Sequence, residues 1–229
     1  MMLNEIIKQM KLKIKIYTLV TLLSALAIIP LNLRSQAPAP PSPVEILPGH
    51  DNLYFQMVLK KSFTPESRLG FFTVTTFSAR WEDFHDVDIT IPIQLFYEIG
   101  KGFAPVAGVS VNTVAGFSPY AGFQHNYASR KVLAVTVVSV SLDADADFKI
   151  FGLYEYRPPI GDSWSFYSRL QFIYNTSLSE GTHNRSFLYL RAGVKHNALS
   201  FGLGANLDRY GPYKTFEPNY GPFFQWAFN

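Results

Sequence analysis

The feature that most constrains this chain is a strict two-residue alternation near its C-terminal end. Between positions 199 and 208, Leu, Phe, Leu, Ala and Leu alternate with Ser, Gly, Gly, Asn and Asp. Residues 185–195 repeat the pattern, with apolar side chains alternating against a face that includes Arg, Tyr and Lys. A period of two is the period of a β-strand, whose successive side chains point to opposite faces. One face of these strands therefore meets an apolar medium and the other a polar one.

Similar segments recur along the chain with turn residues between them. The expected strands are 53–62, 68–81, 87–97, 104–127, 132–142, 148–157, 163–175, 185–195, 199–208 and 220–228. Most reach the roughly 9–11 residues that a tilted strand needs to cross a hydrocarbon layer. Residues 104–127 read either as two short strands or as one strand interrupted near Gly116. An even number of strands requires the second interpretation, which gives about ten strands within a range of eight to twelve.

The pattern over residues 52–229 resembles the small bacterial outer-membrane β-barrels. The resemblance rests on the alternation, on aromatic residues at strand ends such as Trp81, and on the ending Phe224, Trp226 and Phe228. One departure is that Asn229 follows the last aromatic residue, where the family usually ends on it. The resemblance implies an all-β fold, a transmembrane antiparallel up-and-down β-barrel inserted by the barrel-assembly machinery. The general style of the sequence is similar to barrels from Bacteroidota. The alternative fold is a soluble β-sandwich, which would usually have shorter strands.

The N-terminal segment has the layout of a secretory signal peptide. Residues 1–35 contain five Lys and Arg and one Glu. A basic stretch at 1–15 precedes an apolar run at 16–33, and small residues lie near position 35. We expect cleavage near residue 35, a Pro-rich periplasmic linker over 36–51, and a multi-pass protein of the cell outer membrane. A retained inner-membrane helix is the alternative, which Pro30 and Asn32 weaken. The rest of the chain holds fifteen basic and sixteen acidic residues, so its charge predicts no nucleic-acid partner.

The polar faces of the expected strands would line the lumen of such a barrel. Both signs of charge occur there, on Lys60, Arg80, Asp88, Glu98, Lys149, Glu155, Arg157, Arg169, Arg191, Lys195 and Asp208. Because a lone buried charge is costly, we expect these groups to pair across the lumen and fill it. Ten strands are too few for the wide water channel of a general porin. Residues 176–184 and 209–219 read as long loops, which in such barrels are extracellular.

Three further motifs suggest sites: an acidic turn, a cluster of carboxylates beside a histidine, and two histidine–serine pairs. Asp143, Asp145 and Asp147 would share a face and supply oxygen ligands for calcium, but lone acidic turns are usually just solvated. Residues 83–88 place carboxylates beside His85, as in the outer-membrane aspartate–histidine proteases, which draw these groups from separated strands. Here they are contiguous, and ten strands would put this turn in the periplasm.

Outer-membrane lipases place a His and a Ser two residues apart on one strand, so that the His can activate the Ser. None of the five histidines has this spacing. His125 and Ser129, like His196 and Ser200, are four residues apart, about 13 Å along a strand. We therefore predict no catalytic, cofactor-binding or metal-binding residue and no cofactor, and the absence of Cys excludes a cysteine nucleophile.

The resulting functional prediction is a non-enzymatic integral barrel. It would be a structural or accessory subunit of a cell-envelope complex, with outer-membrane lipids and the barrel-assembly machinery as partners. A narrow pore for small solutes or ions is the first alternative, and a lipid-modifying hydrolase is the second. One fold supports all three, because outer-membrane barrels host many unrelated functions.

Overall fold

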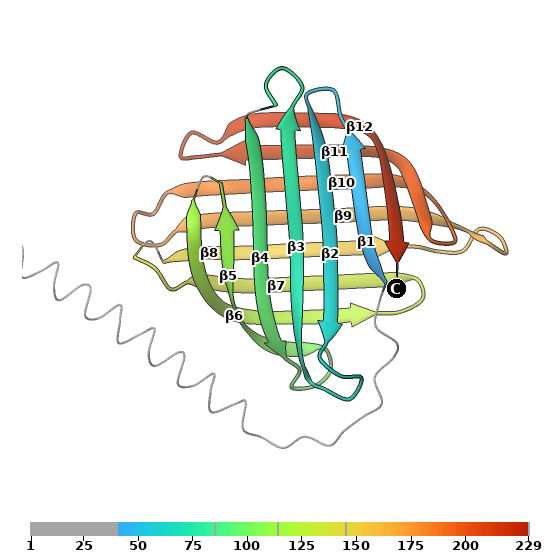
Figure 1. Cartoon of the computed structure of the whole chain (residues 1–229), viewed down its shortest axis with the longest axis horizontal. Helices are drawn as coiled ribbons and strands as arrows, with labels where there is room; N and C mark the ends of the chain where they lie inside the picture. Colours follow the sequence, from blue (N-terminus) through green and yellow to red (C-terminus); the bar gives the residue numbers. More distant parts are fainter. Residues whose placement is uncertain (1–40, 85, 114, 145, 229) are drawn as a thin grey trace, which may run out of the picture. The chain divides into compact units, whose positions relative to one another are not determined.

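The computed structural model describes residues 41–229 except for positions 85, 114, 145 and 229. Within this part the chain forms one closed antiparallel barrel in which each strand pairs with its neighbours in sequence and β1 pairs with β12 (Figure 1). The strands are β1 Ser42–Pro48, β2 Asn52–Ser62, β3 Leu69–Arg80, β4 Val87–Tyr97, β5 Phe103–Asn112, β6 Gly116–Ala128, β7 Val132–Ser141, β8 Asp147–Tyr156, β9 Trp164–Ser177, β10 His183–His196, β11 Leu199–Tyr210 and β12 Thr215–Phe228. In the described residues, no helix has the length and apolarity needed to cross a membrane.

The predicted fold class is confirmed, and the strand number is twelve, at the upper end of the predicted range of eight to twelve rather than the preferred ten. Residues 104–127 form two strands, β5 and β6, joined by a short turn that ends at Gly116 with a φ of +70°. The second additional strand is β1, which lies inside the segment predicted as linker, so the barrel starts ten residues before the expected residue 52. The number of strands stays even, as predicted, because β1 and the division of residues 104–127 each add one strand. The signal peptide and residues 36–40 of the linker lie outside the described residues.

Strand β1 closes the barrel. Its residues 42–46 pair with 228–224 of β12, and its residues 44–48 pair with 57–53 of β2. Val44 and Ile46 face out while Glu45 and Leu47 point inward and are buried. Because Pro43 and Pro48 flank this short alternation, it is hidden within a proline-rich stretch of the sequence.

The turns at the two ends of the barrel are all short, which corrects two expectations. The long loops predicted at 176–184 and 209–219 are only the short turns 178–182 and 211–214, because β9 to β12 are longer than the alternation indicated. We call the end with these turns the loop end, and the end at which β1 begins and β12 ends the terminal end. With β1 included, the turn at 81–86 lies at the same end of the barrel as the turns at 178–182 and 211–214.

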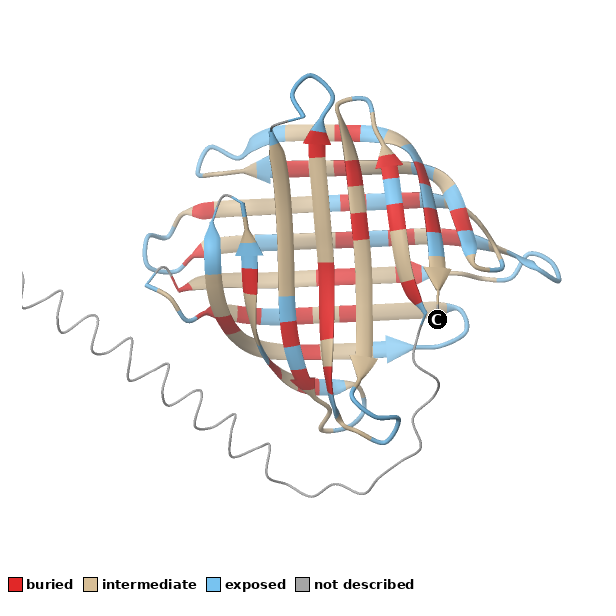
Figure 2. Ribbon diagram, in the orientation of Figure 1, coloured by how far each residue is buried: buried red, intermediate tan, exposed pale blue. Residues whose placement is uncertain are grey.

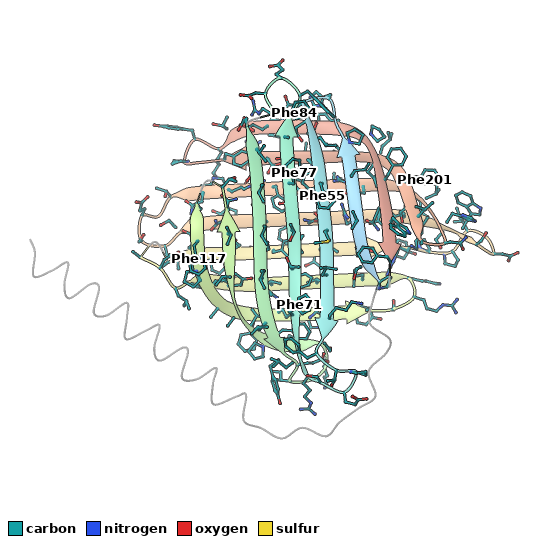
Figure 3. The ribbon with its side chains drawn as sticks, in the orientation of Figure 1. Phe55, Phe71, Phe77, Phe84, Phe117 and Phe201 are labelled. Carbon is teal, nitrogen blue, oxygen red and sulfur yellow. The ribbon has the colours of Figure 1, made fainter. Side chains whose placement is uncertain are left out.

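The outer surface of the barrel is apolar, as the alternation predicted. Ile89, Ile91 and Ile93 of β4 point outward, whereas Asp88 and Gln94 of the same strand point into the barrel. Phe224 and Trp226 of β12 are 52% and 57% exposed on the outside. Figure 2 shows buried and more exposed positions along the same strands, and Figure 3 labels phenylalanines from β2, β3, β6, β11 and the 81–86 turn.

The interior has an apolar half and a polar half. Side chains of β3, β4, β5, β7 and β8 form the apolar half, which consists of Phe72, Val74, Phe96, Ala104, Val106, Val135, Val137 and Leu153. This explains why β7 is apolar at nearly every position: Val135 and Val137 pack in the interior while Val138 faces outward. Twelve strands enclose more space than eight, and large buried aromatic residues help to fill it.

Candidate functional site: a polar column through the lumen

Polar and charged side chains of β1, β2 and β8 to β12 form a column beside the apolar half. It begins at the loop end, passes a group of buried charges in the middle, and continues to Glu155, Arg157 and Lys195 near the terminal end. The charged residues predicted to point inward face the lumen, as their registers with neighbouring strands show for Arg169 and Arg191. The column therefore connects the two ends of the barrel.

The middle of the column is a three-residue group that we call the constriction: Glu45, Arg169 and Arg191. Glu45 Oε1 lies 2.6 Å from Arg169 Nη2, 2.8 Å from Arg191 Nη2 and 2.9 Å from Arg191 Nε. All three side chains are at most 1% exposed. One carboxylate between two guanidinium groups leaves a net charge of +1 where water has no access. Sequence reasoning found both arginines but missed Glu45, because it lay in the predicted linker.

Gly204 of β11 makes room for the constriction. A Cβ at this position would lie 2.5 Å from Leu47 Cδ1 and 2.9 Å from Arg191 Cδ. The alternation of glycine with leucine in β11 therefore has a packing reason, since a larger inward side chain would collide with the arginine. This contact is invisible in the sequence, because Leu47 and Arg191 belong to distant segments.

A hydrogen-bonded group extends the constriction toward the terminal end. Arg169 Nη1 donates to Gln225 Oε1 at 3.2 Å. The Tyr167 hydroxyl lies 2.9 Å from both Gln225 Oε1 and Glu155 Oε1. Glu155 also lies 3.5 Å from Arg157. Arg169 and Arg191 thus pair with a carboxylate from a non-adjacent strand, as the predicted lumen network requires, whereas Glu155 pairs with Arg157 two residues along the chain.

Several buried polar atoms of the column have no hydrogen-bond partner among the described residues. They include Glu45 Oε2, Arg169 Nε, Gln56 Nε2, Asn206 Oδ1 and both side-chain polar atoms of Gln171. Buried polar groups in proteins are nearly always paired with protein or with ordered water. Such atoms in a polar interior have the capacity to bind water or a small solute.

The loop end of the column opens into a polar pocket that we call the vestibule, with a volume of about 240 Å³. Arg185 at its floor lies 3.0 Å from Asp88 Oδ2 and 2.9 Å from Asp208 Oδ1, and its guanidinium lies 4.7 Å from the ring centre of Tyr210. These residues come from β4, β10 and β11, so one arginine links three strands.

The vestibule carries more acidic than basic groups. Its lining includes four carboxylates, on Asp86, Asp88, Asp208 and Glu217, against Arg80 and Arg185. At the rim, Arg80 pairs with Glu217 at 2.9 Å and with Asp86 at 3.4 Å, and these side chains are 41–65% exposed. The charge along the column therefore changes sign, from a negative vestibule to a positive constriction.

The structure places the other two acidic motifs only in part. Asp143 is hydrogen-bonded by Ser118 and Ser141, and Asp147 by Asn175 and Asn184, while Asp145 lies outside the described residues. Within the described part of the chain, no three His, Asp or Glu side chains are grouped to hold a metal ion. His85 lies outside the described residues.

The two histidines with a serine four residues away have aromatic neighbours. His125 lies 4.5 Å from Phe103 and His196 lies 4.5 Å from Trp164, measured between ring centres. Ser200 points into the lumen and is 1% exposed, whereas His196 lies on the outside with Trp164. The turn at residues 197–198 reverses the chain between His196 and Ser200, so the two side chains do not share a face.

Comparisons with known proteins give distant likenesses only. No family model and no curated protein matches the chain. Among solved structures, the NanC porin in its rhombohedral crystal form is 9% identical, with a TM-score of 0.47 over 83% of this chain and 100% of that one. OccK5 (OpdH) of Pseudomonas aeruginosa is 12% identical, with a TM-score of 0.39 over 74% of this chain and 65% of that one. OccK10 (OpdN) of the same organism is 12% identical, with a TM-score of 0.40 over 80% and 66%.

The surface of the barrel decides its environment. Large apolar side chains are exposed on the outside of the barrel, such as Ile93 at 49% and Leu203 at 72%, while the charges of the constriction are buried in its interior. Closure of the sheet lets the backbone groups of the described strands pair, which lipid requires. The protein is a membrane-spanning β-barrel. The outward aromatic residues near the strand ends of this barrel, including Trp164 and Trp226, match the interfacial girdles of transmembrane barrels.

Proposed function

We propose that this outer-membrane barrel is a narrow pore for small anions and that the described conformation is its closed state. The observation that carries the proposal is the polar column, which runs beside an apolar half from the vestibule to the terminal end. The column is blocked where Glu45 joins Arg169 and Arg191, since these side chains are almost fully buried. Movement of this one group would connect the vestibule with the polar residues beyond it.

The unpaired polar atoms favour a path over a permanent plug. A purely structural network is most stable when every buried polar group has a partner. Among the described residues, the column instead leaves polar atoms without partners on Gln171 and Asn206 toward the loop end and on Ser200 and Arg157 toward the terminal end. These groups would bind a row of water molecules, and a small ion could exchange its hydration for them.

The charge of the constriction supports anions as the substrate class. Two guanidinium groups face one carboxylate, so the constriction carries a net positive charge. Arginine also suits anions because its planar donors bind a carboxylate at two points. The acidic vestibule would then set the rate of entry and make it dependent on ionic strength.

Planar-bilayer recording of the purified full chain tests this proposal. The expected result is a small conductance whose reversal potential in a salt gradient shows a preference for chloride or acetate over potassium. Glu45→Ala should increase the conductance several-fold, and Arg191→Gln should reduce the anion preference. Glu180→Ala, at an exposed position in the turn at residues 178–182, is the control and should leave single-channel selectivity nearly unchanged.

If neither the unmodified protein nor any of these variants conducts ions, the proposed pore function is wrong. The expected role as an accessory subunit of an envelope complex would then be the better explanation, and no observation on the barrel identifies such a partner. A pull-down in mild detergent that recovers one stoichiometric partner would support that role.

A further inference from the structure

A serine and a histidine at the loop end of β10 have the geometry of an activated nucleophile. Ser186 Oγ lies 3.0 Å from His183 Nε2, and His183 Nδ1 lies 2.8 Å from the carbonyl oxygen of Gly211. We propose that Ser186 and His183 form a catalytic dyad on the outer surface of the barrel that hydrolyses acyl esters of membrane lipids. This activity is separate from the proposed pore, because neither residue lines the column.

A β-bulge brings the two side chains together. The register between β9 and β10 shifts between His183 and Arg185, so that Asn184 is the extra residue. Asn184 donates to Asp147, and Arg185 binds Asp88 and Asp208 within the vestibule, so two consecutive side chains point inward. His183 and Ser186, three residues apart, therefore share the outer face. A regular strand would place them on opposite faces, which is why a search for two-residue spacing missed them.

The hydrogen bonds define which nitrogen of His183 acts as the base. A carbonyl oxygen only accepts hydrogen bonds, so the bond to Gly211 requires a proton on Nδ1. In the neutral ring Nε2 is then an acceptor, and the Ser186 hydroxyl donates to it. This is the arrangement in which a histidine can take the proton of a serine nucleophile, with its orientation fixed by a third group. His183 is only 7% exposed, which protects this orientation.

The surroundings of Ser186 suit a lipid substrate. Tyr174 of β9 and Arg209 of β11 are its direct partners in the sheet, so both lie beside it on the outer face. Tyr174 is 42% exposed, and Arg209 packs over Phe216, which is 48% exposed. Aromatic residues at strand ends mark the membrane interface, where the acyl esters of lipids lie. The Arg209 guanidinium is placed to bind a lipid phosphate or the negative oxygen that forms during the reaction.

The reaction consumes one water and needs no cofactor. Ser186 Oγ attacks the ester carbonyl as His183 Nε2 takes the hydroxyl proton, and a tetrahedral intermediate forms. Its collapse breaks the bond to the leaving alcohol, which receives that proton and departs, while the acyl group stays on Ser186. Water then gives a proton to His183 and its hydroxide attacks the acyl group. Ser186 regains the proton, and a fatty acid is released.

A structural role for the same contacts makes different predictions. In a structural role, His183 and Ser186 would only connect β10 to the turn at residues 211–214. Their loss would then lower the stability of the barrel, and Ser186 would not be reactive. The deciding measurement is therefore the nucleophilicity of Ser186 in folded protein. Reaction of the detergent-purified full chain with a serine-reactive fluorophosphonate, followed by peptide mass spectrometry, measures it without any substitution.

The expected result is stoichiometric labelling of Ser186 in the unmodified protein. Hydrolysis is then followed with p-nitrophenyl butyrate, with phosphatidylethanolamine vesicles and with lipid A micelles, and the last two distinguish the lipid source. Ser186→Ala should abolish turnover and His183→Ala should reduce it by about 100-fold or more, the usual contribution of a general base. Ser168→Ala and His196→Ala, also on the outer face, are the controls and should retain it.

Heat-modifiable electrophoresis would verify that each variant remains a folded barrel. If His183→Ala does not fold, His183→Gln provides the second variant, and the labelling of the unmodified chain stands without either. Absence of label on Ser186, or equal hydrolysis by unmodified protein and Ser186→Ala, would overturn the dyad. Neither outcome bears on the pore, because the bilayer recordings measure a different property.

Discussion

Removal of the Glu45 carboxylate is the sharpest perturbation that the constriction offers. In Glu45→Ala, the guanidinium groups of Arg169 and Arg191 would face each other without the carboxylate that lies 2.6–2.9 Å from both. Both side chains are at most 1% exposed, so solvent cannot replace it. Breaking a buried ion pair by removing one partner typically costs about 3–5 kcal/mol. We expect a loss of this size in the free energy of unfolding, unless water enters the lumen and hydrates the arginines.

The assay is reversible urea unfolding of the purified barrel in lipid vesicles, followed by tryptophan fluorescence. Glu217→Ala is the matched control, because it also removes a carboxylate 2.9 Å from an arginine, but at a site where the two side chains are 41% and 45% exposed. Exposed pairs contribute about 1 kcal/mol or less. The two variants therefore separate the effect of burial from the effect of the pairing itself.

A second measurement distinguishes destabilisation from opening. If Glu45→Ala loses less than about 3 kcal/mol while its conductance rises, water has hydrated the arginines and the constriction acts as a gate. A loss below about 1 kcal/mol with no conductance would refute the reasoning, because two buried charges would then have lost their partner without consequence. Replacement of all three residues by apolar side chains of similar volume should restore most of the stability, since such exchanges are often neutral.

Three further predictions concern other parts of the lumen. Gly204→Ala should displace the Arg191 side chain and lower any measured conductance, because the added Cβ would lie 2.9 Å from Arg191 Cδ. Arg185→Ala leaves Asp208 without its guanidinium partner in the vestibule, so urea unfolding should show a loss of roughly 1–3 kcal/mol. Phe72→Ala in the apolar half should cost about 3–5 kcal/mol in the same assay, as cavities in packed cores do, and an effect under about 1 kcal/mol would mean that this half is not a packed core.

Much of the barrel was predictable because strand alternation is a local property. The inward charges, including Arg169 and Arg191, and the outward isoleucines of β4 occupy the faces that their period of two assigns. The difference between the preferred ten strands and the observed twelve also has local reasons. Prolines at 43 and 48 obscured β1, and the turn before Gly116 looked like an interruption within one strand.

The sequence by itself determined which face of each strand meets lipid and which meets the lumen, because apolar and polar residues alternate with a period of two. Only the tertiary structure decided which lumen groups meet. Glu45 lies 124 residues from Arg169 and 146 from Arg191 along the chain, and closure of β1 on β12 brings them together. The same holds for His183 and Ser186, whose common face depends on one extra residue in the ladder with β9. A two-residue period carries no information about pairing across a barrel or about a register shift, because both arise from contacts between strands.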